Sequence, residues 1–192
     1  PMYLVARKLT EKLNVPVEIR YLRVSRYSLR IPEYHLLGEQ CLDRIFLSGI
    51  DVSLYQILKR AGLKKEEISR ISEELHCNGI LRKNLNPRQI TELKQYVLKC
   101  CRGHKTDLLD TIYVRSKAAY NSTIGYLKRE GLLDPVRYGV VDSGWVGTIQ
   151  QSLRNILKES QPEIQITGYY FGLYALPKDR TGCHYKAYFF EP

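Results

Sequence analysis

The sequence has no hydrophobic run that approaches the roughly 18 apolar residues needed to cross a membrane. It also lacks repeats and low-complexity tracts, and its 44% hydrophobic and 26% charged residues are typical of a folded domain. The five cysteines form no Cys-x-x-Cys pair, which speaks against a disulfide framework. These absences predict a cytoplasmic protein without a transmembrane segment.

A metal site is the alternative use of the cysteines and histidines. Cys100, Cys101 and His104 lie close in sequence, and either the pair at 183–184 or the pair at 76–77 could complete a zinc site. Structural zinc sites favour well-separated Cys-x-x-Cys or His-x-x-x-His pairs, which the sequence does not contain. We therefore expect buried thiols and surface histidines.

Negative charge is in short supply, because 30 Lys+Arg stand against 20 Asp+Glu and give a net charge of +10. A basic protein of this kind favours anionic partners: nucleic acid, phosphorylated small molecules or an anionic membrane face. The last of these would place the protein at the inner face of the membrane. The basic residues are spread through most of the chain, so charge alone does not choose among the partners.

The chain divides into three stretches, 1–39, 40–135 and 136–192. In the first, apolar residues at helical spacing predict a helix over 2–13, and alternation predicts a strand over 17–25. A helix followed by a strand is half of an α/β unit whose first strand would precede Pro1. We therefore expect the chain to be part of a longer protein.

The middle stretch is predicted to be a helical insertion. Apolar stripes recur over 54–61, 68–75, 86–98 and 107–130, with breaks at glycine or Asn-Pro. The first two of these helices could form a helix-turn-helix, with Lys64, Lys65 and Arg70 facing DNA. Four glutamates on the second helix would repel phosphate, so we expect no specific nucleic-acid binding.

The last stretch returns to α/β order. It predicts a central strand ending at Asp142, a glycine loop, a helix beginning near Val146, and a second strand over 163–174. The predicted fold is therefore α/β, with a mostly parallel, Rossmann-like sheet and a helical insertion. Loops at the carboxyl edge of such a sheet bind ligands.

The glycine loop, residues 142–148, is the main candidate site. Gly144 and Gly147 would let backbone N–H groups approach an anion at the start of a helix. Ser143 and Thr148 supply hydroxyl groups, and Asp142 could accept hydrogen bonds from a sugar or hold Mg²⁺. In the alternative reading, Asp142 and Ser143 only cap the helix and Trp145 fills the core. The complete candidate set on this side is Asp142, Ser143, Gly144, Trp145, Gly147, Thr148 and Gln150.

Three residues of the first stretch are candidate partners for the loop. Arg23 and Ser25 would share one face of the predicted strand, and Arg26 would lie at its end. A guanidinium group can bind phosphate through two parallel hydrogen bonds. Arg26 is therefore the preferred phosphate ligand among them.

Two segments resemble one bacterial family. Residues 141–150 match the pattern VDxGWxGTxQ, and residues 25–32 match SRxxLxxP. Both patterns are similar to those of predicted hydrolases of the haloacid dehalogenase superfamily that are associated with cell-surface polysaccharide biosynthesis and with glycosyltransferases. The resemblance implies a capsular or O-antigen biosynthesis protein. No Asp-x-Asp nucleophile pair occurs in the sequence, so phosphatase chemistry is not expected of these residues.

The same loop is also similar to the ribose-phosphate loop of type I phosphoribosyltransferases, through Asp142, Gly147 and Thr148. Val141 replaces the first acid of that motif, so the resemblance implies a fold and a phosphate-binding loop but no transferase activity. The expected ligand is a phosphorylated sugar or nucleotide sugar. The alternative is a non-catalytic module that partners a glycosyltransferase, and whether the protein is an enzyme is left open.

Overall fold

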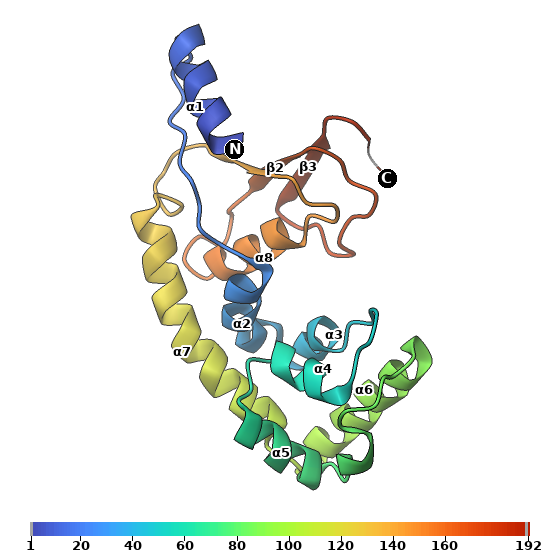
Figure 1. Ribbon diagram of the computed structural model, residues 1–192. Coiled ribbons are helices and arrows are strands. Elements are labelled where there is room, and N and C mark those ends of the chain that lie inside the picture. Colours follow the sequence, from blue (N-terminus) through green and yellow to red (C-terminus); the bar gives the residue numbers. More distant parts are fainter. Residues whose placement is uncertain (1, 191) are drawn as a thin grey trace.

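The computed structural model describes residues 2–190 and 192 and shows a mixed α/β protein that is 53% helical. Helices from the middle of the chain form one end of the molecule, and a small parallel sheet lies towards the other end, near the C-terminus (Figure 1). In chain order the elements are α1 (Met2–Leu13), α2 (Arg26–Leu37), η1 (Gly38–Gln40), α3 (Cys41–Ile45), α4 (Leu54–Arg60), α5 (Lys65–Glu74), η2 (Asn78–Ile80), α6 (Pro87–Arg102), α7 (Leu108–Arg129), β1 (Gly139–Asp142), α8 (Thr148–Leu157), β2 (Ile166–Tyr170) and β3 (Cys183–Ala187).

The predicted helices of the middle stretch are confirmed as α4, α5, α6 and α7. Ser53 and Asn86 each form a capping box with the residue three positions on, which satisfies the free N–H groups of α4 and α6. Gly62 has a φ of +81°, the left-handed conformation that ends α4 and turns the chain into α5. The apolar stripes of these helices, together with part of α2, enclose the larger of two hydrophobic cores.

The predicted strand over 17–25 is wrong. These residues are extended, but they join no strand ladder, and Arg23 donates its backbone N–H to the Tyr126 hydroxyl at 2.8 Å instead. The alternating pattern has a different use, because Leu22 and Val24 pack against the smaller core. Apolar alternation thus reports burial on one side, and it does not guarantee that a neighbouring strand is present to pair with.

Helix α2 follows directly and was not predicted. Ser25 accepts a hydrogen bond from the Ser28 backbone, and Ser28 reciprocates, so the pair starts the helix. Pro32 lies inside the helix and obscures its pattern, because proline removes a helical hydrogen bond. Leu29 faces the smaller core and Ile31 the larger one, so α2 connects the two.

The sheet contains three parallel strands in the order β1-β2-β3. The predicted strand before the glycine loop is confirmed as β1, but the prediction that it is central is wrong, because β1 is at the edge of the sheet. Helix α8 covers one face of the sheet and buries Leu153, Ile156 and Leu157 in the smaller core. On the other face, Val141 and Tyr169 are exposed.

The helix after the glycine loop is confirmed, although it begins at Thr148 rather than near Val146. Gly147 has a φ of +67°, and a left-handed residue cannot be part of an α-helix, so the first helical residue is the next one. The second predicted strand is confirmed as the shorter β2.

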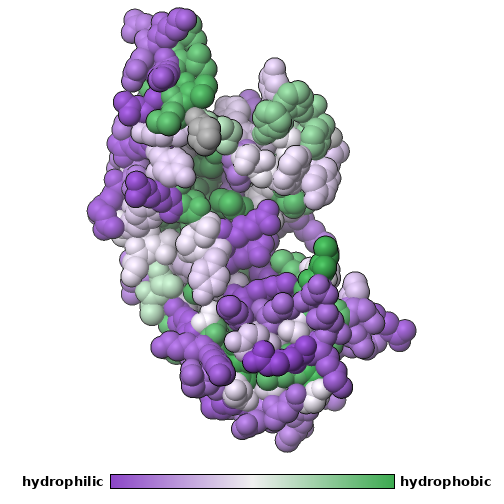
Figure 2. Space-filling model, viewed as in Figure 1, coloured by the Kyte–Doolittle hydropathy of each residue, from purple (hydrophilic) through white to green (hydrophobic). Residues whose placement is uncertain are grey.

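The predicted N-terminal helix is confirmed as α1, which buries none of its residues. Its apolar side chains Met2, Val5 and Leu9 are exposed. Figure 2 shows apolar side chains along one side of this helix, at the top of the molecule. Among the residues that the structure describes, no helix combines the length and the apolarity that a membrane crossing requires.

Candidate functional site

The glycine loop follows the carboxyl end of β1. Asp142 accepts a hydrogen bond from the Gly144 backbone N–H through its Oδ1 atom, at 3.0 Å. This contact folds the loop back on itself and uses only one of the lone pairs on the carboxylate. Ser143 is exposed, and Asp142 is partly accessible, so both can meet a ligand from solvent.

Gly147 shapes the loop where it joins α8. A Cβ atom at this position would overlap the ring of Tyr185, and the left-handed backbone also disfavours any side chain. No side chain caps the amino end of α8, in contrast to α2, α4 and α6. The free N–H groups of the first turn, starting at Thr148, therefore form the electropositive end of the helix dipole.

Trp145 does not fill the core. Its side chain is 48% exposed, and its ring stacks on Phe190 at a centroid distance of 6.1 Å and contacts Tyr174 at 6.1 Å. The Tyr174 backbone N–H also donates to the Trp145 carbonyl at 3.2 Å. The loop is thus anchored to the segments that follow β2 and β3, and it presents an aromatic ring to solvent.

Gln150, the last candidate of this side, lies fully buried between α8 and the sheet. Its Nε2 atom donates to the carbonyls of Ile166 and His184, at 2.8 and 3.0 Å, and its Oε1 accepts from the Tyr170 hydroxyl at 2.8 Å. Both ends of the amide are therefore engaged inside the protein, and the side chain ties α8 to β2 and β3.

The candidates of the first stretch lie apart from the loop. Ser25 is the N-cap of α2, and Arg26 is the first residue of that helix. Within the described part of the chain, no hydrogen bond or ion pair joins Arg23, Ser25 or Arg26 to the loop residues. The structure therefore does not bring the two halves of the predicted site into contact.

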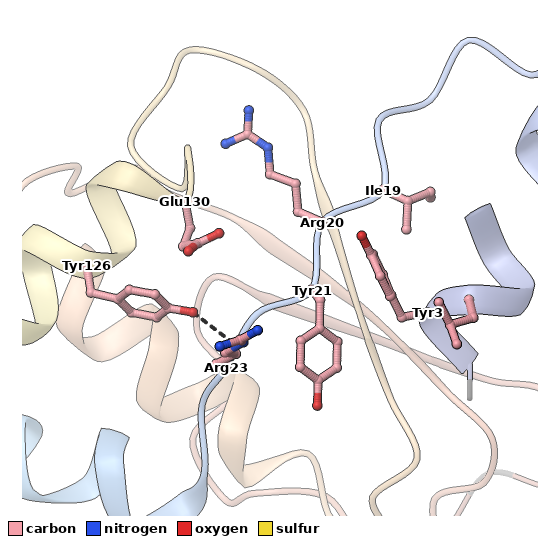
Figure 3. Close-up of a pocket in the computed structure, with 8 residues that line it drawn as sticks. Tyr3, Ile19, Arg20, Tyr21, Arg23, Tyr126 and Glu130 are labelled. Atoms are coloured by element: carbon pink, nitrogen blue, oxygen red, sulfur yellow. Dashed lines mark hydrogen bonds between the residues drawn. The ribbon is translucent and has the colours of Figure 1, made fainter.

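Arg23 instead lines an open groove of about 740 Å³ beside the end of α7. Figure 3 shows Tyr3, Tyr21 and Tyr126 around this groove, with Arg23 and Glu130 at its α7 side. None of the residues that line this groove belongs to the glycine loop, so the groove and the loop are separate features.

Sequence reasoning missed Arg44, which contacts the first turns of α8. The Arg44 guanidinium donates to Oε1 of Gln151 in the first turns of that helix. Burial lowers the pKa of the Arg30 guanidinium, and the nearby charges of Arg44 and Arg26 lower it further. Arg30 is thus close enough to Arg26 and Arg44 for their charges to act on it, and we call these three residues the arginine cluster; Arg44 is the member that contacts α8. Only the fold brings these residues together, since Arg44 lies in the predicted helical insertion.

Glu33 is the carboxylate inside this cluster. Its side chain is completely buried, with its Oε1 atom 3.9 Å from the Arg44 guanidinium. Burial raises the pKa of Glu33, and this effect outweighs Ser152, Arg44 and Asn155, which lower it. Ser152 and Asn155 lie beside the carboxylate without a hydrogen bond of normal geometry to either oxygen. A buried carboxylate with this surrounding is destabilising when charged.

We expect Glu33→Gln to stabilise the protein by about 1–2 kcal/mol at pH 7. Because the folded-state pKa is raised, the protonated acid is favoured in the folded protein, and stability falls as pH rises above the ordinary value for glutamate. The stabilisation should therefore shrink towards pH 4, where the native side chain is also neutral. Urea unfolding at both pH values measures this difference, and an equal effect at both would contradict it.

The sequence analysis named two alternative sites, a metal site and a DNA-reading helix. Among the described residues, no group of three or more His, Cys, Asp or Glu side chains is placed to hold a metal ion. Burial raises the pKa of Cys41 to about 12 and that of Cys101 to about 11, which keeps both thiols protonated at neutral pH. In the possible DNA-reading helix α5, Arg70 is paired with Glu74 and Asp107.

No model of a known protein family matches this chain, and a search of the curated proteins finds no match either.

Proposed function

We propose that this chain is a Rossmann-like or phosphoribosyltransferase-like domain with a helical insertion, and that its glycine loop binds a phosphorylated sugar or a nucleotide sugar. The observation that carries the proposal is the amino end of α8, which no side chain caps and which follows Gly147 at the carboxyl edge of a parallel sheet. Phosphate groups bind at such helix ends because free N–H groups and the helix dipole both favour negative charge. Arg44 of the arginine cluster adds positive charge beside the first turns of α8.

Each loop residue has a role in this proposal. The N–H groups at Thr148 and the residues after it receive the phosphate, and the hydroxyls of Ser143 and Thr148 donate further hydrogen bonds. The Asp142 carboxylate accepts one hydrogen bond from the Gly144 N–H, and its remaining lone pairs accept hydrogen bonds from sugar hydroxyls. Asp142 is also the residue that would contact Mg²⁺ accompanying a nucleotide diphosphate.

The biological setting follows from the resemblance to polysaccharide-associated proteins of the haloacid dehalogenase superfamily. We propose that the chain belongs to a bacterial surface-polysaccharide biosynthesis protein that works beside a glycosyltransferase in the cytoplasm. Its use there could be catalytic, or it could be a binding module that holds the sugar for its partner.

The test is calorimetric titration of UDP-glucose and glucose 1-phosphate, each with and without Mg²⁺. Asp142→Asn keeps the contact to Gly144 and removes the charge, so we expect affinity to fall about tenfold with little change in stability. Asp110→Asn, an exposed position on α7, is the matched control and should leave affinity unchanged. We also expect Arg26→Ala to weaken binding about tenfold, although Arg26 makes no direct contact with the loop residues, because a guanidinium group can bind an extended phosphorylated ligand.

Saturable binding that is lost in Asp142→Asn and kept in Asp110→Asn would support the loop as the site. If Asp142→Asn and Arg26→Ala both bind like the parent protein, the loop is structural. If no sugar phosphate or nucleotide sugar binds at all, the interaction-module alternative is favoured over the proposal.

A further inference from the structure

Helix α1 carries an apolar stripe that the rest of the protein leaves uncovered. We define the α1 stripe as Met2, Val5, Leu9 and Leu13, which follow one another at spacings of three or four residues and so share one side of the helix. The exposed fractions of these side chains lie between 50% and 66%. In Figure 2 apolar side chains run along one side of this helix, at the end of the molecule opposite to α5 (Figure 1).

A different side of α1 faces the protein. Tyr3, Ala6 and Thr10 are the partly buried residues of the helix. The Tyr3 ring lies 5.5 Å from the ring of Tyr21, which belongs to the extended segment that leads to α2. The helix is therefore attached through this side, while the stripe beside it stays open to solvent.

A helix of this length gains stability from a surface that covers it. Helix α1 has 12 residues and buries none of them, and isolated helices shorter than about 12–15 residues are marginal in water. A contiguous apolar surface that stays exposed marks a site for a protein or for a membrane. The charges beside the stripe decide between these two partners.

Two lysines border the stripe. Lys8 and Lys12 each follow a member of the stripe by three residues, so they are its neighbours on the helix surface. Both are exposed, and neither forms a hydrogen bond or ion pair with any part of the chain that the structure describes. Glu11, the acidic residue of the helix, is instead paired with Arg7 at 3.4 Å. The positive charge next to the stripe is therefore not compensated by the protein.

This combination fits an anionic phospholipid surface. In an interfacial helix the apolar side chains enter the boundary between headgroups and acyl chains, and the basic side chains contact lipid phosphates. Twelve residues span about 18 Å, whereas the hydrocarbon core is about 30 Å thick, so α1 can lie along the surface but cannot cross it. The net charge of +10 attracts the whole chain to the same surface.

We propose that α1 binds the surface of an anionic phospholipid bilayer, with the α1 stripe inserted at the level of the headgroups and with Lys8 and Lys12 against lipid phosphates. The inference goes beyond the proposed function, since none of these residues belongs to the glycine loop.

Co-sedimentation of the full chain with sucrose-loaded vesicles tests this proposal. One set of vesicles is made of phosphatidylcholine alone, and the other mixes phosphatidylcholine with anionic phosphatidylglycerol. We expect the protein to sediment with the mixed vesicles and much less with the neutral ones, and we expect the bound fraction to fall as salt rises. A protein that stays in the supernatant with the mixed vesicles overturns the proposal.

Substitutions on the two sides of α1 locate the binding surface. Leu9→Gln should weaken binding to the mixed vesicles about tenfold, because a polar side chain replaces an inserted apolar one. Glutamine is a good helix former, so the helix is retained. Leu4→Gln is the matched control, because Leu4 is also exposed on α1 but lies away from the stripe and lines the groove beside α7. Leu4→Gln should bind like the parent protein, and an equal effect of the two substitutions contradicts the proposal.

Lysine variants separate the charge of α1 from the charge of the whole protein. Lys8→Gln combined with Lys12→Gln should weaken binding to the mixed vesicles about tenfold and leave the weak binding to neutral vesicles unchanged. Lys99→Gln combined with Lys105→Gln removes the same charge from exposed positions in and just after α6, which lies at the other end of the molecule from α1 (Figure 1). This control should bind like the parent protein. An equal loss in both double variants would show that net charge, and not α1, attracts the protein.

A second copy of the chain is the other occupant that these variants can reveal. Sedimentation velocity without vesicles detects a dimer, and a dimer that Leu9→Gln dissociates, in a protein that binds no vesicles, overturns the proposal in favour of an interface between copies. The affinity for UDP-glucose should be the same in Leu9→Gln as in the parent protein. Failure of this inference and failure of the proposed function are therefore observed separately.

Discussion

Replacing Gly147 with alanine is expected to destabilise the protein by about 2–4 kcal/mol and to abolish the ligand binding that we propose for the glycine loop. The left-handed backbone at this position, with a φ of +67°, costs about 1–2 kcal/mol for a residue with a Cβ atom. The new methyl group would also overlap the Tyr185 ring, and forced overpacking costs about 1–3 kcal/mol. The loop can relieve both problems only by moving, which displaces the N–H groups that we propose receive the phosphate.

Urea unfolding and calorimetric titration of the same samples measure the two effects. Gly125→Ala is the matched control, because Gly125 lies within α7 where a Cβ atom has room. Alanine favours a helix over glycine, so this variant should be more stable by about 0.5–1 kcal/mol. A Gly147→Ala protein that is as stable as the parent would show that the left-handed turn is not required.

The glycine loop could be predicted from the sequence because its signals are local. A short apolar run ends at Asp142, two glycines follow, and a helical period begins within a few residues, so each step is set by its neighbours in the chain. The helices of the middle stretch were predictable for the same reason. Apolar stripes and breaks at glycine or Asn-Pro define them without reference to the rest of the fold, and Ser53 and Asn86 cap two of them in the structure.

The parts that could not be predicted depend on contacts between distant residues. Leu22 and Val24 alternate like a strand, but whether they pair is decided by what lies beside them in space. The edge position of β1 likewise depends on strand order, which no local pattern encodes. Helix α2 was missed because Pro32 interrupts it, although the reciprocal serines at its start were a usable signal.

The candidate site also contains residues that the sequence identifies and residues that only the fold brings together. The sequence grouped Arg26 with the loop through an expected strand, whereas the fold makes Arg26 the start of a helix and places it with Arg30 and Arg44. Arg44 and Gln151 are 107 residues apart, so only the tertiary structure shows their contact. Glu33 could not be identified either, since a buried carboxylate looks like any other charged helical residue in a sequence.

Gln150→Leu is expected to destabilise the protein by about 3–5 kcal/mol. Leucine has a similar size, so the substitution removes the amide without leaving a large cavity. It leaves the Tyr170 hydroxyl without its acceptor, and it deprives the carbonyls of Ile166 and His184 of a donor. Each buried polar group that loses its partner costs about 1–3 kcal/mol, and these three lie on the two strands that α8 must hold.

A double-mutant cycle with Tyr170→Phe tests this account. In Gln150→Leu the Tyr170 hydroxyl loses its acceptor, and phenylalanine lacks that hydroxyl. Tyr170→Phe should therefore lower the stability of the parent protein, but it should lower the stability of the Gln150→Leu variant little or not at all. The coupling between the two positions should be about 1–2 kcal/mol in urea unfolding. The sequence placed Gln150 among the ligand-binding residues, and the same variant examines that prediction. If Gln150→Leu unfolds like the parent protein yet loses affinity for UDP-glucose, its amide contacts the ligand, and the bonds to β2 and β3 are not what holds α8 on the sheet.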